Sequence, residues 1–436
     1  MAINSDIEAV DDIFQEGKVV DGFVIGKEVH RGGMASLFSA TKEGIDVPIL
    51  LKIPRVGKDQ PVESLIGFET ELTILRSLKS PYVPKYLGSG NMATRPYIAM
   101  ERVEGRPLED YIKEGKVFTI DEVVRIGADL AQAVQSLHSQ DAIHLDIKPE
   151  NILIDDKGKL TLIDFGLSHH ARYPDLLAEE MRKAVGSPIW IAPEQVVGVR
   201  GDPRSDVFAI GVMLYQLATG EAPFGEPATT EGMRQRLWMD PTPPRQRRPD
   251  LPEWLQEVIL RCLEPEAQHR YSSAALLAFD LDNVDQITVT ARGRQTEGTG
   301  FWTHFKRWLR AAGKHYQPSP LPSRQIEEVP IIMVAVPHYD VTDATLYSLR
   351  EAVARSLGIR PGARLACVSV ISPGESSATD ATRSETTLHR QHITRMRQWA
   401  QPLDLSQHQA SFHVLESSDV ADALLRYAQG NDVNMI

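Results

Sequence analysis

Four polar side chains flank a predicted β-hairpin in the first half of the chain. They are Asp146, Lys148, Asn151 and Asp164. Residues 152–154 and 160–163 are apolar and form its strands, and the polar residues 155–159, which include a glycine, form its turn. Because a hairpin returns the chain to the end where it began, the four side chains converge. Two carboxylates, an amide and an amine favour Mg²⁺ and a phosphate, since Mg²⁺ takes oxygen ligands. Any one of them alone would be interpreted as a solvated turn residue.

Two further groups are suited to binding phosphate. Gly32 and Gly33 lie between two predicted strands, where successive backbone N–H groups can surround a phosphate, although Gly-Gly is also a common turn. Lys52 ends the apolar strand 48–52, a place where a lysine is usually a solvated edge charge. Glu71 lies in the predicted helix 68–75, whose apolar residues share one face with it.

Composition limits the classes of protein that the chain can belong to. Its 436 residues suggest two or three domains, and a net charge of −12 argues against general nucleic-acid binding. Neither a run of about 18 apolar residues nor a secretion signal is present, so we expect no transmembrane segment and a cytoplasmic protein. Cys262 and Cys367 are far apart, which indicates neither a disulfide framework nor a thiolate zinc site.

These motifs resemble those of protein kinases. Residues 143–151 resemble the catalytic loop H-R-D-x-x-x-x-N, residues 164–166 read D-F-G, and residues 192–194 read A-P-E. The resemblance covers residues 18–283 and implies an α+β bilobal fold, with an N-lobe at 18–100 and a C-lobe at 104–283. It also implies ATP, a protein substrate and Mg²⁺, with Mn²⁺ as the alternative metal.

The resemblance also implies a role for each site residue. Asp146 receives the proton of a substrate hydroxyl, and Lys148 lies beside the transferring phosphate. Lys52, paired with Glu71 rather than with the competing Glu69, fixes the nucleotide. The residues implied to hold magnesium are Asn151 and Asp164. Those implied to bind ATP, besides Lys52, are Val29, Gly32, Gly33, Leu37, Leu50, Met100, Glu101 and Val103.

The form of the catalytic loop indicates the acceptor. D-x-K-P-E-N around Lys148, together with Ser187, resembles serine/threonine kinases. His30 and Ala35 replace two glycines of the family's glycine-rich loop, and Leu50 replaces the alanine that packs on adenine. These departures leave open a slow enzyme, or an ATP-binding pseudokinase that acts as a scaffold or switch in stress signalling.

Leu145 predicts how the kinase is controlled. In the family an arginine usually stands here and pairs with a phosphorylated residue of the activation segment, which leucine cannot do. Residues 167–191 contain no threonine and only the hydroxyls of Ser168, Tyr173 and Ser187. The sequence therefore predicts a non-RD kinase that does not depend on phosphorylation of its activation segment.

The second lobe is predicted to support the catalytic loop. A helix follows the capping-box pattern at residues 119–122, and residues 205–217 form a helix that is apolar almost all round. A carboxylate in that core helix needs hydrogen-bond donors, so Asp206 is expected to bind backbone N–H groups of the catalytic loop. Glu194 and Arg270 are expected to form a structural ion pair, as their counterparts do in the family.

The remaining segments lie outside the kinase match. Residues 1–17 are expected to be a loosely ordered acidic lead, and residues 284–329 a linker containing a short basic aromatic helix at 301–312. The face at residues 301–310 suits an acidic membrane surface, a weak peripheral contact, or a groove of this acidic protein; we favour the groove because the segment is short.

Residues 330–436 alternate strands with helices, which predicts a smaller α/β domain with a mostly parallel sheet. The order resembles a universal stress protein domain without its phosphate loop and last strands, and Pro337 replaces an aspartate of nucleotide-binding members. Such a sheet leaves an exposed edge, so we expect pairing with another chain, for example a dimer through this domain. A stress-responsive binding module is the third functional alternative.

Overall fold

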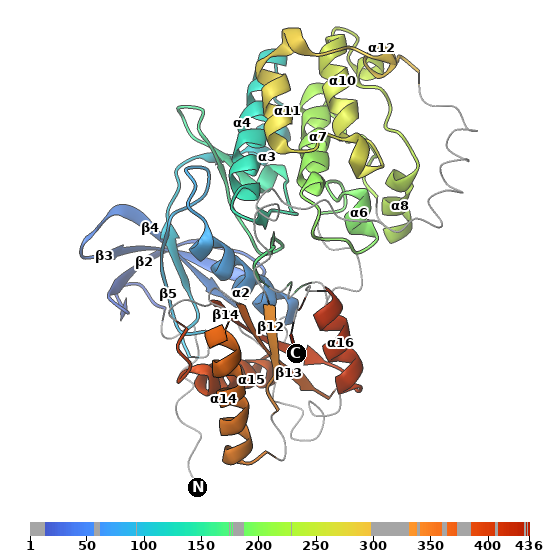
Figure 1. Ribbon diagram of the computed structural model, residues 1–436. Helices are drawn as coiled ribbons and strands as arrows, with labels where there is room; N and C mark the ends of the chain where they lie inside the picture. Colours follow the sequence, from blue (N-terminus) through green and yellow to red (C-terminus); the bar gives the residue numbers. More distant parts are fainter. Residues whose placement is uncertain are drawn as a thin grey trace.

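The computed structural model describes residues 14–436 apart from 56–61, 93, 174, 176, 178–186, 228, 298–330, 338–340, 360–363, 373–384, 406–408, 431, 432 and 434. The helix predicted at 301–312 lies outside these residues. The described chain forms a sheet-rich first lobe, a helical second lobe and a smaller C-terminal domain (Figure 1).

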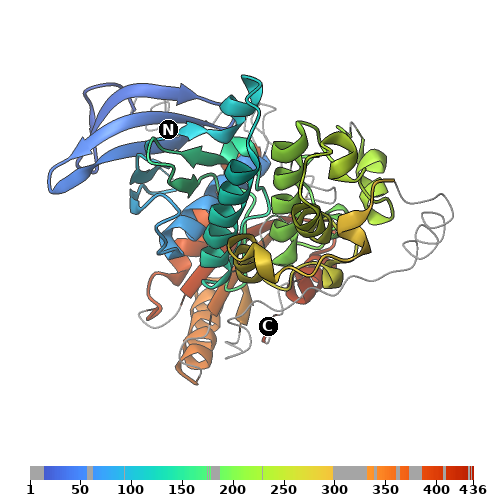
Figure 2. The ribbon, with the colours of Figure 1, turned by 90° about the horizontal axis from the view of Figure 1, so that it is seen from above.

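The first lobe is built on one antiparallel sheet, whose strands β2 to β4 are drawn in blue at the upper left of Figure 2. Its strands in spatial order are β1 (Val19–Val20), β2 (Phe23–Arg31), β3 (Ala35–Lys42), β4 (Ile45–Pro54), β6 (Ile98–Glu101) and β5 (Tyr86–Ser89). Alternate residues Ile49, Leu51 and Ile53 of β4 are buried in its core, as the period of two in a strand requires. Phe14, in the segment expected to be loosely ordered, is buried against the ring of Tyr97.

Helix α2 (Val62–Ser77) packs beside this sheet. Its buried residues Leu65, Phe68 and Leu75 join the main apolar core, which continues into the second lobe. Gly67 lies so close to the D-F-G segment that a Cβ atom there would be 3.2 Å from the carbonyl oxygen of Gly166. The position of α2 is therefore tied to that of residues 164–166.

The second lobe packs helices around the core helix α7. Its α-helices are α3 (Leu108–Lys113), α4 (Ile120–His138), α6 (Pro193–Val196), α7 (Arg204–Thr219), α8 (Thr230–Arg234), α9 (Pro244–Arg247), α10 (Glu253–Cys262), α11 (Ala274–Asp282) and α12 (Ala291–Arg294). The predicted capping box of α4 is confirmed, because Thr119 Oγ1 accepts from the N–H of Glu122 and the Glu122 carboxylate accepts from the N–H of Thr119. The predicted burial of α7 is confirmed as well, with Val207, Ile210 and Leu214 fully buried.

Four short strands and a 3₁₀ helix shape the centre of this lobe. They are β7 (Arg106–Pro107), β8 (Ala142–Ile143), β9 (Ile152–Ile154), β10 (Leu160–Leu162) and the 3₁₀ helix η1 (Pro149–Asn151). Strands β9 and β10 pair antiparallel, as the predicted hairpin requires, and β8 pairs with β11 (His169–His170).

Packing on the second lobe continues beyond residue 283, into the range expected to be linker. The amide of Gln256 donates to the carbonyl oxygens of Arg292, Gly293 and Gln295. The carboxylate of Glu257 accepts from Thr290 and Arg292. The first part of this range is therefore attached to α10.

The C-terminal domain has a three-stranded, fully parallel sheet in the order β12 (Ile331–Ala335), β13 (Arg364–Ile371), β14 (Gln409–Glu416). Helices α14 (Asp343–Ile359) and α15 (Glu385–Ala400) share an apolar core with one face, and α16 (Val420–Gly430) with the other. An isolated parallel bridge joins Met435 to Ile332 on the free side of β12. The predicted alternation of strands and helices is confirmed.

The C-terminal domain lies against the side of the first lobe that carries α2 (Figure 1). Helix α15 contacts α2, and strand β14 lines a cavity together with α2. Among the described helices, none combines the length and the apolar character that crossing a bilayer requires.

Candidate active site

Asp206 of α7 fixes the start of the catalytic loop. Its carboxylate accepts from the backbone N–H groups of His144 at 2.9 Å and Leu145 at 2.8 Å, as predicted, and lies 2.8 Å from Nε2 of His138. Leu145 adopts a φ of 63°, a conformation that side chains rarely take. The loop is thus held in a strained shape by a fully buried acid; His138 was not predicted from the sequence.

Three side chains surround the carboxylate of Asp146. Lys148 Nζ lies 2.8 Å from Oδ2, Asn151 Nδ2 donates to Oδ2 at 3.1 Å, and Ser187 Oγ lies 3.4 Å from Oδ1. Lys148 also donates to Ser187 Oγ at 3.1 Å. Asn151 donates a second hydrogen bond to the backbone oxygen of Asp146 at 2.9 Å, which leaves its Oδ1 atom as an acceptor. The expected contact between Ser187 and Asp146 is therefore confirmed.

Lys52, Glu71 and Asp164 form a second group. Lys52 Nζ is 2.5 Å from Oε2 of Glu71 and 3.4 Å from Oδ1 of Asp164. The pair with Glu71, rather than with Glu69, is confirmed. Burial alone would lower the pKa of Lys52, but the two carboxylates outweigh burial and hold that pKa above its usual value. The positive charge of Lys52 is the main cause that holds the pKa of Asp164 below its usual value. Lys52 and Asp164 are therefore charged near neutral pH, whereas burial raises the pKa of Glu71 against the opposing effect of Lys52.

The D-F-G segment places Asp164 toward this group. Asp164 has a φ of 64°, and Phe165 is buried with its ring 5.1 Å from that of His144. The hairpin thus brings Asp164 to the same end as Asp146 and Asn151, as predicted.

The residues expected to bind the nucleotide line up on neighbouring strands. In the sheet register, Leu37 faces Lys52 and Leu50 faces Met100, so the loop between β2 and β3 lies beside the Lys52 group. Gly32 and Gly33 form that loop, and the N–H of Gly32 donates to the Ala35 carbonyl. The rest of the set is Val29, which is exposed on β2, Glu101, whose N–H donates to the Lys85 carbonyl, and Val103, which follows β6.

Oxygen atoms suited to a divalent cation are present at the hairpin end. Asn151 Oδ1 and the Asp164 carboxylate are hard oxygen donors beside a basic group, which suits a small cation shared with phosphates. Elsewhere in the described residues, no group of three or more His, Cys, Asp or Glu side chains could hold a metal. His169 of the neighbouring pair His169–His170 lies 3.4 Å from Asp175 instead.

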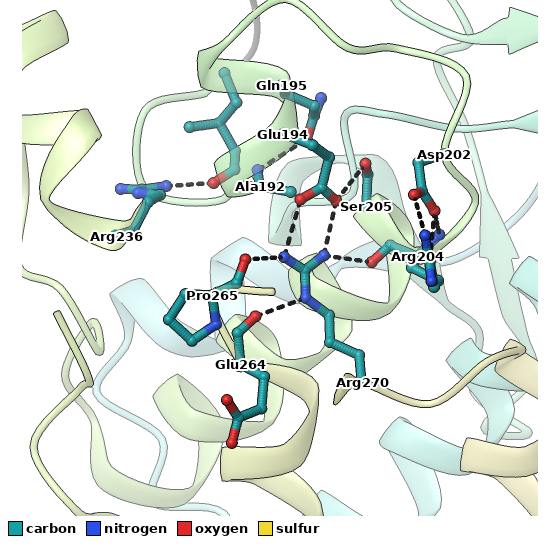
Figure 3. Close-up of polar contacts among 11 residues, drawn as sticks. Ala192, Glu194, Gln195, Asp202, Arg204, Ser205, Arg236, Glu264, Pro265 and Arg270 are labelled. Carbon is teal, nitrogen blue, oxygen red and sulfur yellow. Dashed lines mark hydrogen bonds and ion pairs between the residues drawn. The ribbon is translucent and has the colours of Figure 1, made fainter. Parts of the chain in front are cut away.

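A buried ion pair supports the end of the activation segment. Arg270 donates to both oxygens of Glu194, at 2.7 and 2.9 Å, and Ser205 donates to the same carboxylate at 2.7 Å (Figure 3). The predicted pair of Glu194 and Arg270 is confirmed, and both side chains are fully buried.

Two residues that the sequence did not point out hold residues 188–192. The guanidinium of Arg236, which is 1% exposed, donates to the carbonyls of Pro188 at 2.8 Å and of Ile191. Gln195 accepts from the N–H of Ala192 at 2.9 Å and donates to the carbonyl of Leu145 at 3.0 Å. A glutamine three residues after Ala192 is a capping pattern that could have suggested the contact of Gln195 with the Ala192 N–H. No local pattern marks Arg236.

Comparison with known proteins decides the family. The protein kinase domain model matches residues 23–281, more than half of the chain. The chain belongs to the protein kinase family. Kinases of this family use ATP and a divalent metal.

The kinase segment is similar to bacterial serine/threonine-protein kinases. A probable serine/threonine-protein kinase of Corynebacterium efficiens is 29% identical over 63% of this chain and 43% of its own length. The probable serine/threonine-protein kinase PknB of Corynebacterium glutamicum is 28% identical, over 64% and 45% respectively. The serine/threonine-protein kinase PknB of Mycolicibacterium smegmatis is 28% identical, over 61% and 43%. The chain thus spans less than half of the length of these relatives.

Proposed function

We propose that this protein is a serine/threonine kinase that transfers the γ-phosphate of ATP to Ser or Thr hydroxyls of a protein substrate. One observation carries the proposal: a single carboxylate, Asp146, is surrounded by Lys148, Asn151 and Ser187. These contacts place the Asp146 carboxylate beside an amine, a combination that can receive a proton next to a developing phosphate charge.

The transfer step follows from these positions. The substrate hydroxyl oxygen forms a bond to the γ-phosphorus while the bond from that phosphorus to the β,γ-bridging oxygen breaks, and ADP leaves. The hydroxyl proton goes to the carboxylate of Asp146. Lys148, 2.8 Å from that carboxylate, offsets charge on the transferring phosphate, and Ser187 orients both groups.

Lys52 and Glu71 are proposed to bind and orient the phosphates of the nucleotide. Glu71 holds Lys52 from the α2 side, so that the ammonium group is fixed for the α- and β-phosphates. We assign the adenine and ribose to the residues on β2, β3, β4 and β6 described above, with Met100 and Leu50 at the base and Glu101 and Val103 at the edge.

Asn151 and Asp164 are proposed to hold Mg²⁺, with Mn²⁺ as a substitute. When bound, the ion neutralises charge on the β- and γ-phosphate oxygens. Asn151 is oriented for this role by its two hydrogen bonds to Asp146, which leave Oδ1 available. Asp164 stays ionised because Lys52 lowers its pKa.

We further propose that activity does not depend on phosphorylation of the activation segment. Leu145 is 5% exposed and packs with Ile143 and Ala171, so no cation stands there to receive a phosphate. Arg236 and Gln195 bind residues 188–192 through uncharged carbonyl and amide groups. These contacts supply without phosphate what the family's phosphate-binding arginine usually supplies.

The alternative is an ATP-binding pseudokinase that acts as a scaffold or switch in stress signalling. The observations in its favour are His30 and Ala35 in the glycine-rich loop and the bulk of Leu50 opposite Met100. Against it stands the complete set around Asp146 and Lys52.

For the rest of the chain we propose the domain limits 18–283 for the kinase, 284–329 for a linker whose first part packs on α10, and 330–436 for a universal-stress-protein-like domain. The fully parallel sheet with helices on both faces supports the last assignment. A dimer through this domain belongs to the same proposal.

One assay separates the two functions. Transfer of labelled γ-phosphate to a serine- and threonine-containing protein, with Mg²⁺, should be lost in Asp146→Asn and strongly reduced in Lys52→Met. Asp146→Asn should still bind ATP, because Lys52 is intact. Equal signal from the wild type and both variants would refute the kinase, and ATP binding without any transfer in the wild type would favour the pseudokinase.

A further inference from the structure

Helix α2 carries two buried glutamates that point to different partners. Glu71 contacts Lys52 in the candidate active site at 2.5 Å. Glu69 precedes it by two residues, which is about 200° around an α-helix, so the two carboxylates leave opposite faces. One face of α2 therefore belongs to the phosphate site, and the other faces away from it.

The second face contacts the C-terminal domain. Glu69 Oε1 accepts from Nη2 of Arg397 in α15 at 3.0 Å, across 328 residues of sequence. The guanidinium of Arg397 lies 5.5 Å from the centre of the Phe412 ring of β14, which fixes it from the side of the sheet. The contact thus joins the kinase segment to the framework of the C-terminal domain.

The carboxylate of the pair between Glu69 and Arg397 is buried, so its loss of a partner would be costly. Glu69 is 8% exposed, and burial raises its pKa while Arg397 acts in the opposite direction. Arg397 is partly exposed, but removing it would leave the buried carboxylate of Glu69 without this ion-pair partner. A cavity of about 810 Å³ borders the pair and is lined by α2, by residues 168–173 of the activation segment and by β14. The ion pair lies at the edge of this cavity and joins α2 to the C-terminal domain there.

We propose that Arg397 is a positioning residue for phosphoryl transfer: by holding Glu69 it fixes the rotation of α2 and so keeps Glu71 on Lys52. The C-terminal domain then acts as an activating partner built into the same chain. Gly67 carries the effect further, since its contact with Gly166 couples α2 to the segment that positions Asp164. This inference rests on the proposed kinase function.

Kinetics of full-length variants test the proposal. Arg397→Gln and Glu69→Gln should each lower kcat/KM for ATP about five- to tenfold. The double variant should be no worse than either single one, because both remove the same contact. Arg397→Lys, which keeps the charge, should recover part of the loss. KM for the protein substrate should stay unchanged, a split that general destabilisation would not produce.

Arg426→Gln is the matched control. Arg426 lies in the same domain and pairs with Asp422 of its own helix at 2.7 Å, away from α2, so its loss should leave kcat/KM at the wild-type value. Wild-type kinetics in Arg397→Gln, an equal loss in Arg426→Gln, or multiplying losses in the double variant would each overturn the proposal.

A binding measurement separates this inference from the proposed function. The Kd for ATP with Mg²⁺, measured by calorimetry, should rise in Arg397→Gln even if the wild type transfers no phosphate, because Lys52 is then less well held. If Arg397→Gln fails to fold, Glu69→Gln carries the same comparison from the other partner. An unchanged Kd in the folded variant would contradict the inference.

Discussion

Leu145 places an apolar side chain at the position where the family usually carries an arginine. Its φ of 63° and its apolar contacts with Ile143 and Ala171 place the side chain in a small closed cluster. A leucine side chain has no donor for a phosphate, so at the scale of one residue these contacts support the proposed control by something other than phosphate capture.

Treatment with a protein phosphatase should leave the transfer rate unchanged. The physical reason is that the contacts of residues 188–192 are made by Arg236 and Gln195 to uncharged groups. The measurement is the initial rate of labelled-phosphate transfer before and after complete dephosphorylation, checked by mass spectrometry. A rate that falls with dephosphorylation would show that a phosphate orders the segment after all.

Replacing Asp206 by alanine should destabilise the protein strongly. Two buried backbone N–H groups and His138 would lose their acceptor, which should cost about 3–5 kcal/mol. Urea unfolding measures the loss. Asp250→Ala, at an exposed pair with Arg248, is the control and should change the free energy of unfolding by less than about 0.5 kcal/mol.

The same carboxylate predicts a pH dependence. Burial alone would raise the pKa of Asp206, but His138 and the loop N–H groups outweigh burial and hold it below its usual value. The unfolded state then binds the proton more readily, so this stability is present above about pH 4 and is lost as the pH falls further. Unfolding free energies between pH 3 and 7 should drop more steeply for the wild type than for Asp206→Asn. Parallel curves would contradict this assignment.

At the scale of elements, Arg236, which follows α8, holds residues 188–192, which precede α6. Arg236→Met should raise KM for the protein substrate and lower kcat/KM about tenfold, or about 1.4 kcal/mol, because the carbonyls of Pro188 and Ile191 lose their donor. KM for ATP should not change. Arg234→Met, an exposed arginine on α8 itself, is the control and should behave as the wild type.

The elements themselves were largely predictable from the sequence, whereas several contacts between them were not. The capping box at Thr119, the burial around Asp206 and the hairpin that gathers Asp146 and Asp164 depend on local spacing, which the sequence displays. Arg236 lies in the 3₁₀ helix η2 (Gln235–Leu237), which is too short for a periodic pattern to indicate a buried face.

The two faces of α2 also show that contacts between distant elements are harder to predict than local structure. The apolar residues of α2 and the resemblance to kinases together predicted which glutamate pairs with Lys52. They could not predict the partner of Glu69, because local patterns do not say which surfaces meet across 328 residues. Packing between distant elements is set by the whole fold.

At the scale of the whole molecule, the first lobe lies between two partners, the second lobe and the C-terminal domain (Figure 1). Helix α2 is the element that contacts the D-F-G segment on one side and α15 on the other. The main apolar core runs through both lobes of the kinase, while the C-terminal domain has its own cores on the two faces of its sheet. Changes in the C-terminal domain can therefore alter α2 without unfolding either kinase lobe.

Glu69 and Glu71 of α2 couple the docking of α15 to nucleotide binding in both directions. Linkage requires that if docking of α15 strengthens nucleotide binding, nucleotide strengthens docking by the same factor. A nonhydrolysable ATP analogue with Mg²⁺ should therefore slow hydrogen exchange at residues 393–400 in the wild type and not in Glu69→Gln, as mass spectrometry can measure. The cavity of about 810 Å³ beside Arg397 is a place where a change at the C-terminal domain could act on α2. A molecule that binds in this cavity and changes the docking of α15 would change the affinity for the nucleotide, and the nucleotide would change the affinity for that molecule by the same factor.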